Sequence, residues 1–479
     1  MNKELLQPDQ IQFLHAGSID DVGRVFAWNG RIFRAIHPAQ VEATRRLLAS
    51  GLIDHLVKKG LFPRTTEAAY QLPEFELILE HERVPVVTYP YEWSFEMLKA
   101  AALAVLEVNK IAATYGYQTK DSHAYNVLFE GNRPKFIDLG SFVSYPEGGT
   151  IWEGYAEFLS QYVYPLTVWR DGNEFLARRI LAGATNPFMP VDSFWLYRHP
   201  ILRKLPQKRV KQLARASILQ CYFRGRSTAE LKRKIPGKRG EKLAALRKIV
   251  PTYRINFDRL RQRVQKLQLS TQATMWENYH ISSGLLSAAG RIQPSARFQR
   301  IAAIIAELGV ESVTELAGNQ GVFARYLLEC GQVKQVVCTD YESSAVDTLY
   351  KALADGEAIS PAVLNFVRPL VMSSTSAPDQ RLRSEAVVAL AVTHHLLLTQ
   401  HEQIDHILQS ILPYASRYIL LEFMPLGLFD GKHAPPTPDW YDLEWFRAAC
   451  ERHFDVLEAE QLEENRIIFV GKLRSPIPF

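Results

Sequence analysis

The stretch from residue 313 to residue 321 constrains the fold of this chain more than any other. It reads Val-Thr-Glu-Leu-Ala-Gly-Asn-Gln-Gly, a short apolar strand that ends near an acidic residue and enters a tight turn containing glycine. A second apolar strand follows at 336–340 and also ends in an acid. In a doubly wound α/β fold such strand ends lie side by side where the strand order reverses, and ligands bind there. The pattern therefore predicts a mostly parallel, Rossmann-like sheet in the C-terminal part.

The turn after the first strand lacks the marks of a phosphate-binding loop. Ala317 stands where a dinucleotide fingerprint has its first glycine, and no Lys-Ser or Lys-Thr follows Gly321. Asp340 is placed to accept hydrogen bonds from two ribose hydroxyls. These features predict a ligand with a ribose and an amino acid but no pyrophosphate, namely S-adenosylmethionine. The residues expected to hold its methionine part are Glu315, Gly318, Asn319 and Gly321. A generic Rossmann-like turn without a ligand is the alternative.

Length and cysteine usage bound the class of protein. A chain of 479 residues is too long for one core, so two to four domains are expected. The four cysteines are scattered, with neither metal-ligand spacing nor a disulfide framework. The N-terminus has no apolar core for a signal peptide, and the longest apolar run, 386–398, is interrupted and too short to span a bilayer. These features predict a cytoplasmic protein.

The net charge of +5 conceals one strongly basic segment. From Arg203 to Lys266 there are 21 Lys and Arg residues against 3 Asp and Glu residues. Such a segment can dock on an anionic carrier or a membrane surface. A solvated helical linker is the simpler interpretation. Few aromatic residues interleave with the charges, which makes nucleic acid an unlikely partner.

The apolar patterns divide the chain into three parts. Up to about residue 145 they predict hairpins at 22–36 and 127–137, helices at 38–50 and 95–115, and strands at 75–79 and 84–89. Residues 150–270 are expected to be mainly helical. From about residue 297, helices alternate with strands, and the predicted strands are 312–316, 335–339, 369–374, 387–391 and 418–423. An antiparallel pair, 454–458 with 466–472, is expected to end the sheet.

Three side chains at strand ends are candidates for the base of a methyl transfer. His394 and His395 follow the central strand, and an unperturbed histidine titrates near neutrality. Glu422 ends the next strand and is the other candidate. The histidines are equally able to cap the following helix or line a cofactor pocket. The Pro- and Gly-rich region Leu426–Trp440 is expected to contribute to an acceptor pocket.

Several runs together resemble a bacterial family of methyltransferases similar to nodulation protein NoeA, over most of the chain. These runs begin at Tyr89 (Tyr-Pro-Tyr-Glu-Trp-Ser-Phe), Lys120 (Lys-Asp-Ser-His-Ala-Tyr-Asn), Phe136 (Phe-Ile-Asp-Leu-Gly-Ser-Phe), Leu390 (Leu-Ala-Val-Thr-His-His-Leu) and Leu421 (Leu-Glu-Phe-Met-Pro). The resemblance implies a class I S-adenosylmethionine-dependent methyltransferase. The chain departs from the family at Ala317, where a glycine is usual, and at Glu385, where an aspartate is usual. It also shows no acid after the predicted strand 369–374 for the adenine amino group.

The N-terminal half resembles the kinase fold and small-molecule phosphotransferases. Asp121 and Asn126 lie five residues apart, and Asp138-Leu-Gly follows a hairpin, as in a catalytic loop and a metal-binding Asp-x-Gly loop. The resemblance implies that Asn126 and Asp138 hold Mg²⁺ if the site is active. Arg34 takes the place of the nucleotide-binding lysine, with Glu42 as its expected partner. The readings, in order of preference, are a pseudokinase or scaffold, an active kinase, and coincidence.

The sequence therefore predicts a multidomain protein. A kinase-like α+β domain at 1–150 is followed by a basic helical region at 151–271, and by a Rossmann-like methyltransferase domain at 272–479 with Trp276–Tyr279 in a helix that covers the cofactor. The predicted reaction is methyl transfer from S-adenosylmethionine to oxygen or nitrogen of a small molecule or glycan. The alternatives are a bifunctional kinase/methyltransferase using ATP and Mg²⁺, a phosphotransferase with an accessory S-adenosylmethionine-binding domain, and a non-enzymatic sensor.

Overall fold

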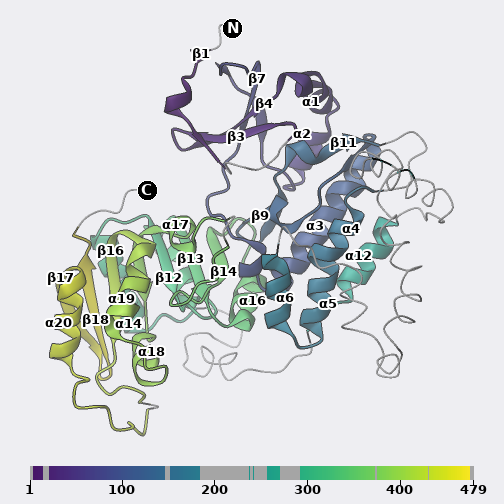
Figure 1. Ribbon diagram of the computed structural model, residues 1–479. Helices are drawn as coiled ribbons and strands as arrows, with labels where there is room; N and C mark the ends of the chain where they lie inside the picture. Colours follow the sequence, from purple (N-terminus) through teal and green to yellow (C-terminus); the bar gives the residue numbers. More distant parts are fainter. Residues whose placement is uncertain are drawn as a thin grey trace, which may run out of the picture. The chain divides into compact units, whose positions relative to one another are not determined.

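The protein divides into two compact units in a computed structural model that describes residues 4–14, 21–145, 152–183, 237, 241, 256–269, 292–372, 375–429 and 431–474 (Figure 1). Unit 1 comprises 1–85, 98–128 and 133–270, and unit 2 comprises 86–97, 129–132 and 271–479. The predicted boundary at 271/272 thus lies one residue from the observed one. The observed units differ from the predicted domains in two ways. Residues 151–270 belong to the same unit as most of 1–150, and two short segments of 1–150 belong to unit 2.

Unit 2 is built on a seven-stranded sheet with the order β14-β13-β12-β15-β16-β18-β17. The five strands from β14 to β16 are parallel, and β18 runs antiparallel to both β16 and β17. The bounds are β12 Ser312–Leu316, β13 Gln335–Asp340, β14 Ile359–Val363, β15 Ser384–Ala389, β16 Ala415–Phe423, β17 Asp455–Glu463 and β18 Arg466–Lys472. The order reverses between β12 and β15, where ligands bind in open α/β sheets.

One predicted strand of this sheet is wrong. The third strand is Ile359–Val363, not 369–374, and the described residues 369–372 form no strand. Pro361 obscured the pattern, because proline removes a backbone donor and argues against a central strand. Here β14 lies at the edge of the sheet, where only one side is hydrogen-bonded. The predicted strands 312–316, 335–339, 387–391, 418–423 and 466–472 overlap observed ones, and two of them match to the residue.

Helices cover both faces of the sheet and close two apolar cores (Figure 1). One core packs α14 (Ala296–Glu307), α15 (Val322–Glu329) and α16 (Ser343–Ala352) on strand residues such as Val313 and Val388. The other packs α18 (Thr393–Leu398), α19 (Ile404–Ile411) and α20 (Leu443–His453) on residues such as Leu316 and Phe469. Adjacent residues of one strand face opposite cores, which explains the continuous apolar runs of buried parallel strands. A short helix, α17 (Pro378–Arg381), precedes β15.

Residues 86–97 and 129–132 complete unit 2 from a distant part of the sequence. The predicted strand 84–89 is wrong, because these residues are irregular; a 3-10 turn at Pro90–Glu92 follows them, and α3 begins at Phe95. Arg381 holds it: Nη2 lies 2.5 Å from Glu92 Oε1, and Nη1 donates to the Val87 carbonyl oxygen at 2.5 Å. Tyr350 donates from its hydroxyl to the Asn132 carbonyl oxygen at 2.9 Å. Unit 2 is therefore assembled from three separate pieces of chain.

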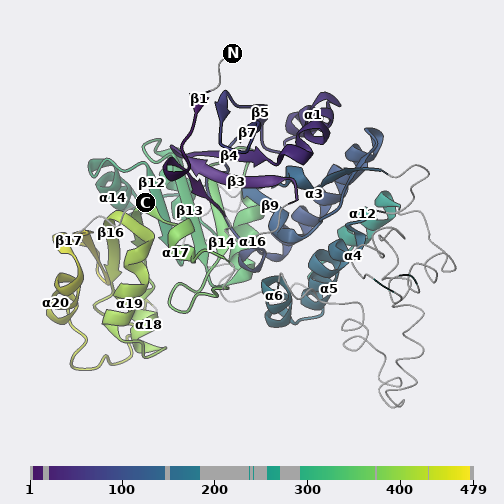
Figure 2. The same ribbon diagram turned by 45° about the horizontal axis from the view of Figure 1, so that its top comes forward.

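Unit 1 begins with a five-stranded antiparallel sheet of order β2-β3-β4-β7-β5 (Figure 2). Its strands are β2 Gln12–Phe13, β3 Gly23–Trp28, β4 Arg31–Ile36, β5 Thr65–Glu67 and β7 Leu77–His81. The hairpin β3–β4 turns at Asn29-Gly30, both with positive φ (48° and 73°), as the sequence predicts. Helices α1 (Val41–Ala49) and α2 (Leu52–Lys58) follow, and β1 (Glu4–Leu5) pairs with β6 (Tyr70–Gln71).

The rest of unit 1 is mainly helical. The predicted helix 95–115 is α3, Phe95–Thr114, which begins in unit 2 and continues into unit 1. Two hairpin-like pairs follow it: β8 (Tyr117–Thr119) pairs with β11 (Phe142–Ser144), and β9 (Val127–Glu130) with β10 (Arg133–Phe136). The helices are α4 Tyr155–Phe158, continuing as a π-helical turn to Val163, then α5 Tyr164–Arg170, α6 Glu174–Ala182 and α12 Phe257–Gln265.

Two sequence expectations fall largely outside the described residues. Trp276–Tyr279 lies outside them, and of the basic segment 203–266 only 237, 241 and 256–266 are described. In α12, Arg261 pairs with Glu107 at 2.7 Å and Asp258 pairs with Lys110 at 2.8 Å. This end of the basic segment is therefore joined to α3 by two ion pairs, one in which α12 supplies the cation and one in which it supplies the anion. None of the described helices is long and apolar enough to cross a bilayer.

Candidate functional site

The turn after β12 is wound tightly by left-handed backbone conformations. Ala317, Asn319 and Gly321 have φ of 56°, 51° and 66°. Residues other than glycine seldom adopt such angles. Two such residues, Ala317 and Asn319, in one turn mark a strained loop of the kind found at ligand sites. Gly321 then caps the N-terminus of α15. The predicted strand, turn and helix are thus present in the predicted order.

Asp340 fixes the turn to the end of β13. Its Oδ2 accepts a hydrogen bond from the Asn319 backbone N–H at 2.8 Å, and its Oδ1 accepts one from the Glu342 backbone N–H at 2.8 Å. Each carboxylate oxygen retains a second lone pair for a ligand hydroxyl. Burial raises the pKa of Asp340, while the backbone donors oppose this shift. The structure therefore places this carboxylate beside the turn, as the sequence predicts.

Glu315 lies beneath the turn rather than on its surface. It is buried, and the Cys338 thiol donates to its Oε2 at 3.6 Å. Burial raises the pKa of Glu315 to about 8. A β-carbon on Gly318 would come within 2.7 Å of both the Glu315 carboxyl carbon and the Cys338 sulfur. Glycine at 318 is thus required by the carboxyl group beneath it, which sequence alone did not reveal.

S-adenosylmethionine can be tested against these groups. Asn319 Oδ1 is a buried acceptor without a hydrogen-bond partner, so it is available to an ammonium or hydroxyl donor. Asp340 supplies an acceptor for a ribose, and Glu315 supplies a carboxylate to balance a cation. All three lie on the ends of the paired strands β12 and β13 or on the turn between β12 and α15. These oxygen acceptors therefore fit a ligand with ribose hydroxyls and a cationic amino-acid part.

The sequence missed the polar residue that follows β14. Asn365 comes two residues after Val363, at the end of β14 that lies beside the end of β13. Its Oδ1 accepts a hydrogen bond from the Arg368 backbone N–H at 2.9 Å. Recognising the strand Ile-Ser-Pro-Ala-Val in spite of its proline would have brought Asn365 into view. A polar side chain is thus present at this edge, although it is an amide and not an acid.

His394 and His395 begin α18, directly after the strand β15 that pairs with β12. His394 is buried, its Nδ1 has no hydrogen-bond partner, and the two rings lie 4.1 Å apart. Burial lowers the pKa of His394 to about 3, with further lowering by His395 and Arg466. Burial also lowers the pKa of His395. Both imidazoles are therefore neutral at pH 7 and able to accept a hydrogen bond.

Glu422 lies in a buried group of ion pairs. Its side chain is fully buried, and Oε1 lies 2.7 Å from Arg297 Nη1 while Oε2 lies 2.8 Å from Arg466 Nη1. Each carboxylate oxygen is thus engaged by a guanidinium group. Arg466 also pairs with Glu463 at 3.0 Å. Glu422 thus joins α14, β16 and β18 as part of an ion-pair network, and its assignment as a base stays a prediction.

The region after β16 contributes to an apolar pocket of about 270 Å³. Leu428, Trp440 and three prolines of this region line it together with Leu397 and Leu398 of α18. The segments Leu426–Trp440 and α18 both follow C-terminal ends of adjacent parallel strands, β16 and β15. The structure thus supports the expectation that Leu426–Trp440 forms part of a ligand pocket.

In unit 1 the structure brings together the four kinase-like residues. Arg34 Nη2 donates to Asp138 Oδ1 at 3.1 Å, and the Asn126 amide lies 3.5 Å from Asp138 Oδ2. Asp121 is held by Ser141, whose hydroxyl donates to the Asp121 carbonyl oxygen at 2.8 Å. Glu42 is not the partner of Arg34 that the sequence predicted, because it lies on the exposed face of α1 and pairs with Arg46 at 3.3 Å.

The groups around Asp138 do not suit Mg²⁺. The Asp138 carboxylate already pairs with a buried guanidinium and accepts from the Gly140 backbone N–H at 3.0 Å. Mg²⁺ takes oxygen ligands in a nearly octahedral arrangement, and a cation at 3.1 Å opposes its binding. Within the described part of the chain, no group of three or more His, Cys, Asp or Glu could hold a metal ion. The Asp138 carboxylate is thus paired with the Arg34 guanidinium.

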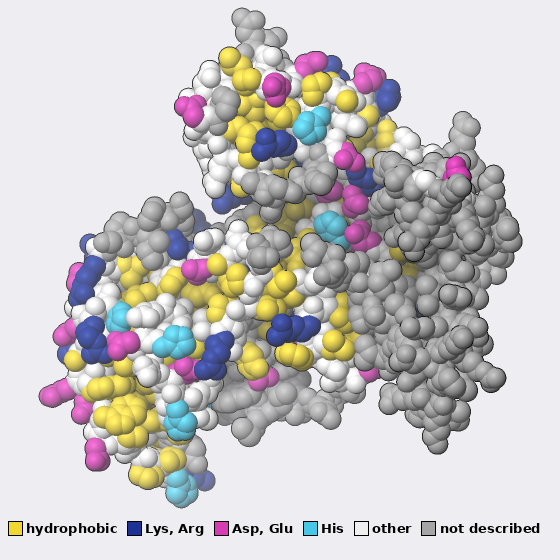
Figure 3. All heavy atoms as spheres, viewed as in Figure 1, with side chains coloured by type: hydrophobic (Ala, Val, Ile, Leu, Met, Phe, Trp, Pro, Cys, Tyr) yellow, Lys and Arg dark blue, Asp and Glu magenta, His cyan; other side chains and the backbone are white. Residues whose placement is uncertain are grey.

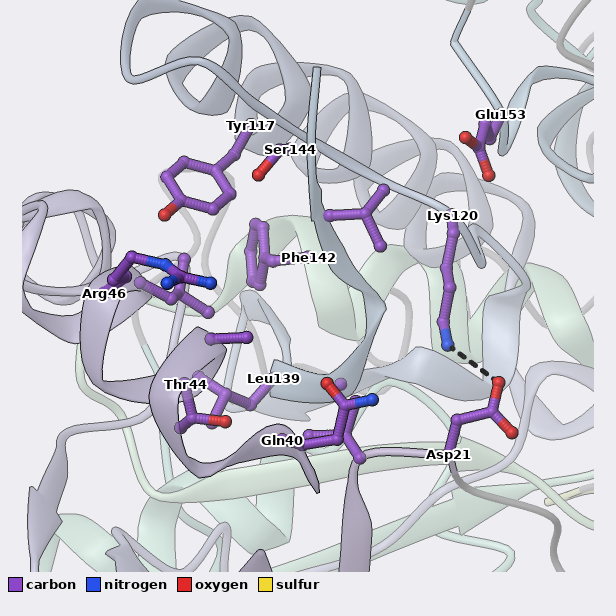
Figure 4. Close-up of a pocket in the computed structure, with 15 residues that line it drawn as sticks. Asp21, Gln40, Thr44, Arg46, Tyr117, Lys120, Leu139, Phe142, Ser144 and Glu153 are labelled. Atoms are coloured by element: carbon purple, nitrogen blue, oxygen red, sulfur yellow. Dashed lines mark ion pairs between the residues drawn. The ribbon is translucent and has the colours of Figure 1, made fainter. Parts of the chain in front are cut away.

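A separate pocket of about 480 Å³ lies in unit 1 beside Leu139 and Gly140 (Figure 4). Arg46 and the hydroxyls of Tyr117 and Ser144 lie at one side of it, and Lys120 lies at the other, 3.8 Å from Asp21 Oδ2. Apolar side chains such as Phe142 lie between them. The pocket is lined by residues of α1, β8 and β11, and neither Asp138 nor Asn126 lines it.

Comparison with known proteins gives one full-length similarity. The chain is 26% identical over 433 residues to nodulation protein NoeA of Rhizobium meliloti strain 1021, which covers 86% of this chain and 84% of that protein. The similarity to NoeA predicted from the sequence is thus confirmed. No protein-family profile matches the chain.

Solved structures resemble part of the chain. The methyltransferase domain of bacterial CtHen1-C matches 37% of this chain and 97% of its own, with 14% identity and a TM-score of 0.30. The N-methyltransferase NodS from Bradyrhizobium japonicum WM9 matches 37% and 97%, with 12% identity and a TM-score of 0.27. An S-adenosylmethionine-dependent methyltransferase from Clostridium acetobutylicum matches 41% and 97%, with 9% identity and a TM-score of 0.31.

Proposed function

We propose that this protein is an S-adenosylmethionine-dependent methyltransferase that acts on oxygen or nitrogen of a small molecule or glycan. The observation that carries the proposal is the turn 317–321 beside Asp340, at the reversal point of a sheet of order β14-β13-β12-β15-β16-β18-β17. A seven-stranded sheet whose last strand pair is antiparallel is the arrangement the class I fold requires. Similarity to NoeA over most of the chain is consistent with it.

In this proposal each side chain has a distinct task. S-adenosylmethionine supplies an electrophilic methyl group attached to a sulfonium. Asp340 accepts from the ribose hydroxyls, and Asn319 Oδ1 accepts from the amino-acid part. Burial raises the pKa of Glu315 to about 8, and a cation bound in the turn would favour its ionised form, which then balances the cationic charge from beneath. Binding energy is thus used to hold two reactants in line, which is the main demand of methyl transfer.

His394 is the residue to which we assign the binding of the methyl acceptor. Its neutral imidazole has a buried Nδ1 without a hydrogen-bond partner, which can accept a hydrogen bond from an acceptor O–H or N–H. Because its pKa of about 3 makes it a weak base, it orients the acceptor by accepting a hydrogen bond and stays neutral, and the proton of the acceptor passes to solvent once the methyl group is bound. His395 packs against it and helps to keep it neutral.

Unit 1 is kinase-like in this proposal but does not transfer phosphoryl groups. Its antiparallel sheet, its long helix α3 and the grouping of Asp121, Asn126 and Asp138 support a kinase-like fold. The pairing of Arg34 with Asp138 favours the pseudokinase reading, because it removes the free carboxylate that Mg²⁺ would need. A bifunctional kinase/methyltransferase is the second candidate, favoured by that same grouping of residues. A cytoplasmic setting and an anionic partner for the basic segment remain parts of the proposal.

The experiment compares ligand binding by the purified full chain and two variants. Asp340→Ala is expected to weaken S-adenosylhomocysteine binding by about 100-fold, the size of one or two lost charge-assisted hydrogen bonds. Asp138→Ala should leave that affinity unchanged. Unaltered binding by Asp340→Ala, with circular dichroism showing a folded chain, would remove the site assignment. ATP hydrolysis that requires Mg²⁺ and Asp138 would establish the second candidate instead.

A further inference from the structure

The pocket after β16 has an almost wholly apolar lining. Among the described residues that line it, only His401 and Trp440 have side chains with a hydrogen-bonding group, an imidazole and an indole N–H. Leu398 and Leu428 face it, with Pro435, Pro436 and Trp440. A sugar ring carries several hydroxyls, and burying them without partners is unfavourable. The pocket is therefore poorly suited to a carbohydrate and well suited to an apolar group.

The pocket is lined in part by α18, the helix that also contains His394 and His395. Leu398 lies four residues after His394 in α18, so the two side chains share one helix face about one turn, or about 5.4 Å, apart. Leu397 is on the adjacent row and is buried. A group seated in the pocket would thus lie about one helical turn from His394. The distance suits a substituent on a ring that occupies the pocket.

The shapes of the lining side chains favour a flat ring over a chain. Trp440 is 45% exposed, although its ring lies 4.7 Å from that of Trp445. Gly427, at φ 58°, is approached by Thr437 and Leu398, which fixes the loop against α18. Prolyl rings and an indole offer flat faces, and aromatic groups pack on such faces in offset or edge arrangements. Figure 3 shows apolar and histidine side chains together on the surface around α18 and α20.

We propose that this pocket binds an aromatic ring of the methyl acceptor, which places the substituent to be methylated beside His394. The proposal rests on the methyltransferase function proposed above. It narrows the acceptor from any small molecule or glycan to one that carries an uncharged aryl group. The pocket supplies apolar contact, and His394 supplies the polar contact that orients the reacting atom.

The test uses three probes that share one sugar: phenyl, hexyl and methyl β-D-glucoside. Binding to the full chain, with and without S-adenosylhomocysteine, is measured by saturation-transfer NMR and competition. The phenyl compound should bind about tenfold or more tightly than the methyl compound, as expected for a buried aromatic contact. It should also bind more tightly than the hexyl compound. Equal binding of the phenyl and methyl compounds, or tighter binding of the hexyl compound, would overturn the proposal.

Variants locate the binding and separate the two proposals. Trp440→Ala and Leu428→Asn should each abolish the preference for the phenyl compound, whereas Leu457→Asn, at a 53% exposed leucine of β17, should keep it. A preference that survives Trp440→Ala would overturn the proposal. If S-adenosylhomocysteine binds but the aryl preference is absent, only this inference fails. If the aryl preference is present but S-adenosylhomocysteine does not bind, the proposed methyltransferase function fails and the pocket stands.

Discussion

Replacing Arg381 by methionine should destabilise unit 2 by disconnecting residues 86–97 from its sheet. The Arg381 and Glu92 side chains are only 6% and 3% exposed and share two contacts, of 2.5 and 3.0 Å. Arg381 also donates to the Val87 and Ser376 carbonyl oxygens, and its guanidinium lies 4.1 Å from the centre of the Tyr89 ring. The substitution therefore leaves a buried carboxylate without its guanidinium and two carbonyl groups without a donor.

Breaking a buried pair by removing one partner costs about 3–5 kcal/mol. We expect the free energy of unfolding of unit 2 to fall by that amount in Arg381→Met. Because the chain has two units, the assay must report on unit 2 alone. Hydrogen exchange of peptides from β15 and β16, followed through a urea series, satisfies this condition and requires no ligand.

Arg417→Met, on β16 of the same unit, is the matched control. Arg417 pairs with Glu385 at 2.9 Å, but the two side chains are 43% and 26% exposed, so the loss should be at most about 1 kcal/mol. The double variant Glu92→Leu/Arg381→Met should be more stable than Arg381→Met, because no unpaired charge remains. Equal effects of Arg381→Met and Arg417→Met would refute the view that residues 86–97 are part of the core of unit 2.

Three further predictions concern the turn and the discontinuous unit. Gly318→Ala should weaken S-adenosylhomocysteine binding and cost about 1–3 kcal/mol of stability, measured by titration and urea unfolding, because its β-carbon would overlap Glu315 and Cys338. Burial raises the pKa of Glu315 from 4.5 to about 8, so the folded state holds the extra proton in that window and stability should fall as pH rises through it. Over the same window S-adenosylhomocysteine affinity should rise by up to about tenfold per pH unit, and Glu315→Gln should abolish both trends. A fragment of residues 272–479, which lacks 86–97 and 129–132, should unfold without a cooperative calorimetric transition, unlike the full chain.

The sequence was sufficient for those parts of unit 2 that follow local rules. The strand 312–316, its turn and Asp340 were found because a buried parallel strand is continuously apolar and its ligand-binding end is marked by glycine and an acid. Hairpins were found where Asn29-Gly30 set the turn. In each case the signal and the structure lie within a few residues of each other.

Other features of the fold and the site could not be predicted from the sequence, because they depend on contacts between distant residues. Nothing in 84–97 indicates that this segment joins a sheet nearly three hundred residues away, because Glu92 meets Arg381 only in the folded chain. The ion pairs of Glu422 were missed for the same reason, since Arg297 and Arg466 come from α14 and β18. For β14, the local rule itself misled, because Pro361 is tolerated only at the edge position that the topology gives it.

Direct titration of the purified full chain with S-adenosylhomocysteine tests the central claim most directly. The turn 317–321 and Asp340 predict binding at one site per chain, measured as heat released in isothermal calorimetry, and the same chain should give no signal with ATP and Mg²⁺. Absence of S-adenosylhomocysteine binding by a folded sample would contradict the methyltransferase function, and binding of ATP with Mg²⁺ would contradict the role assigned to Arg34.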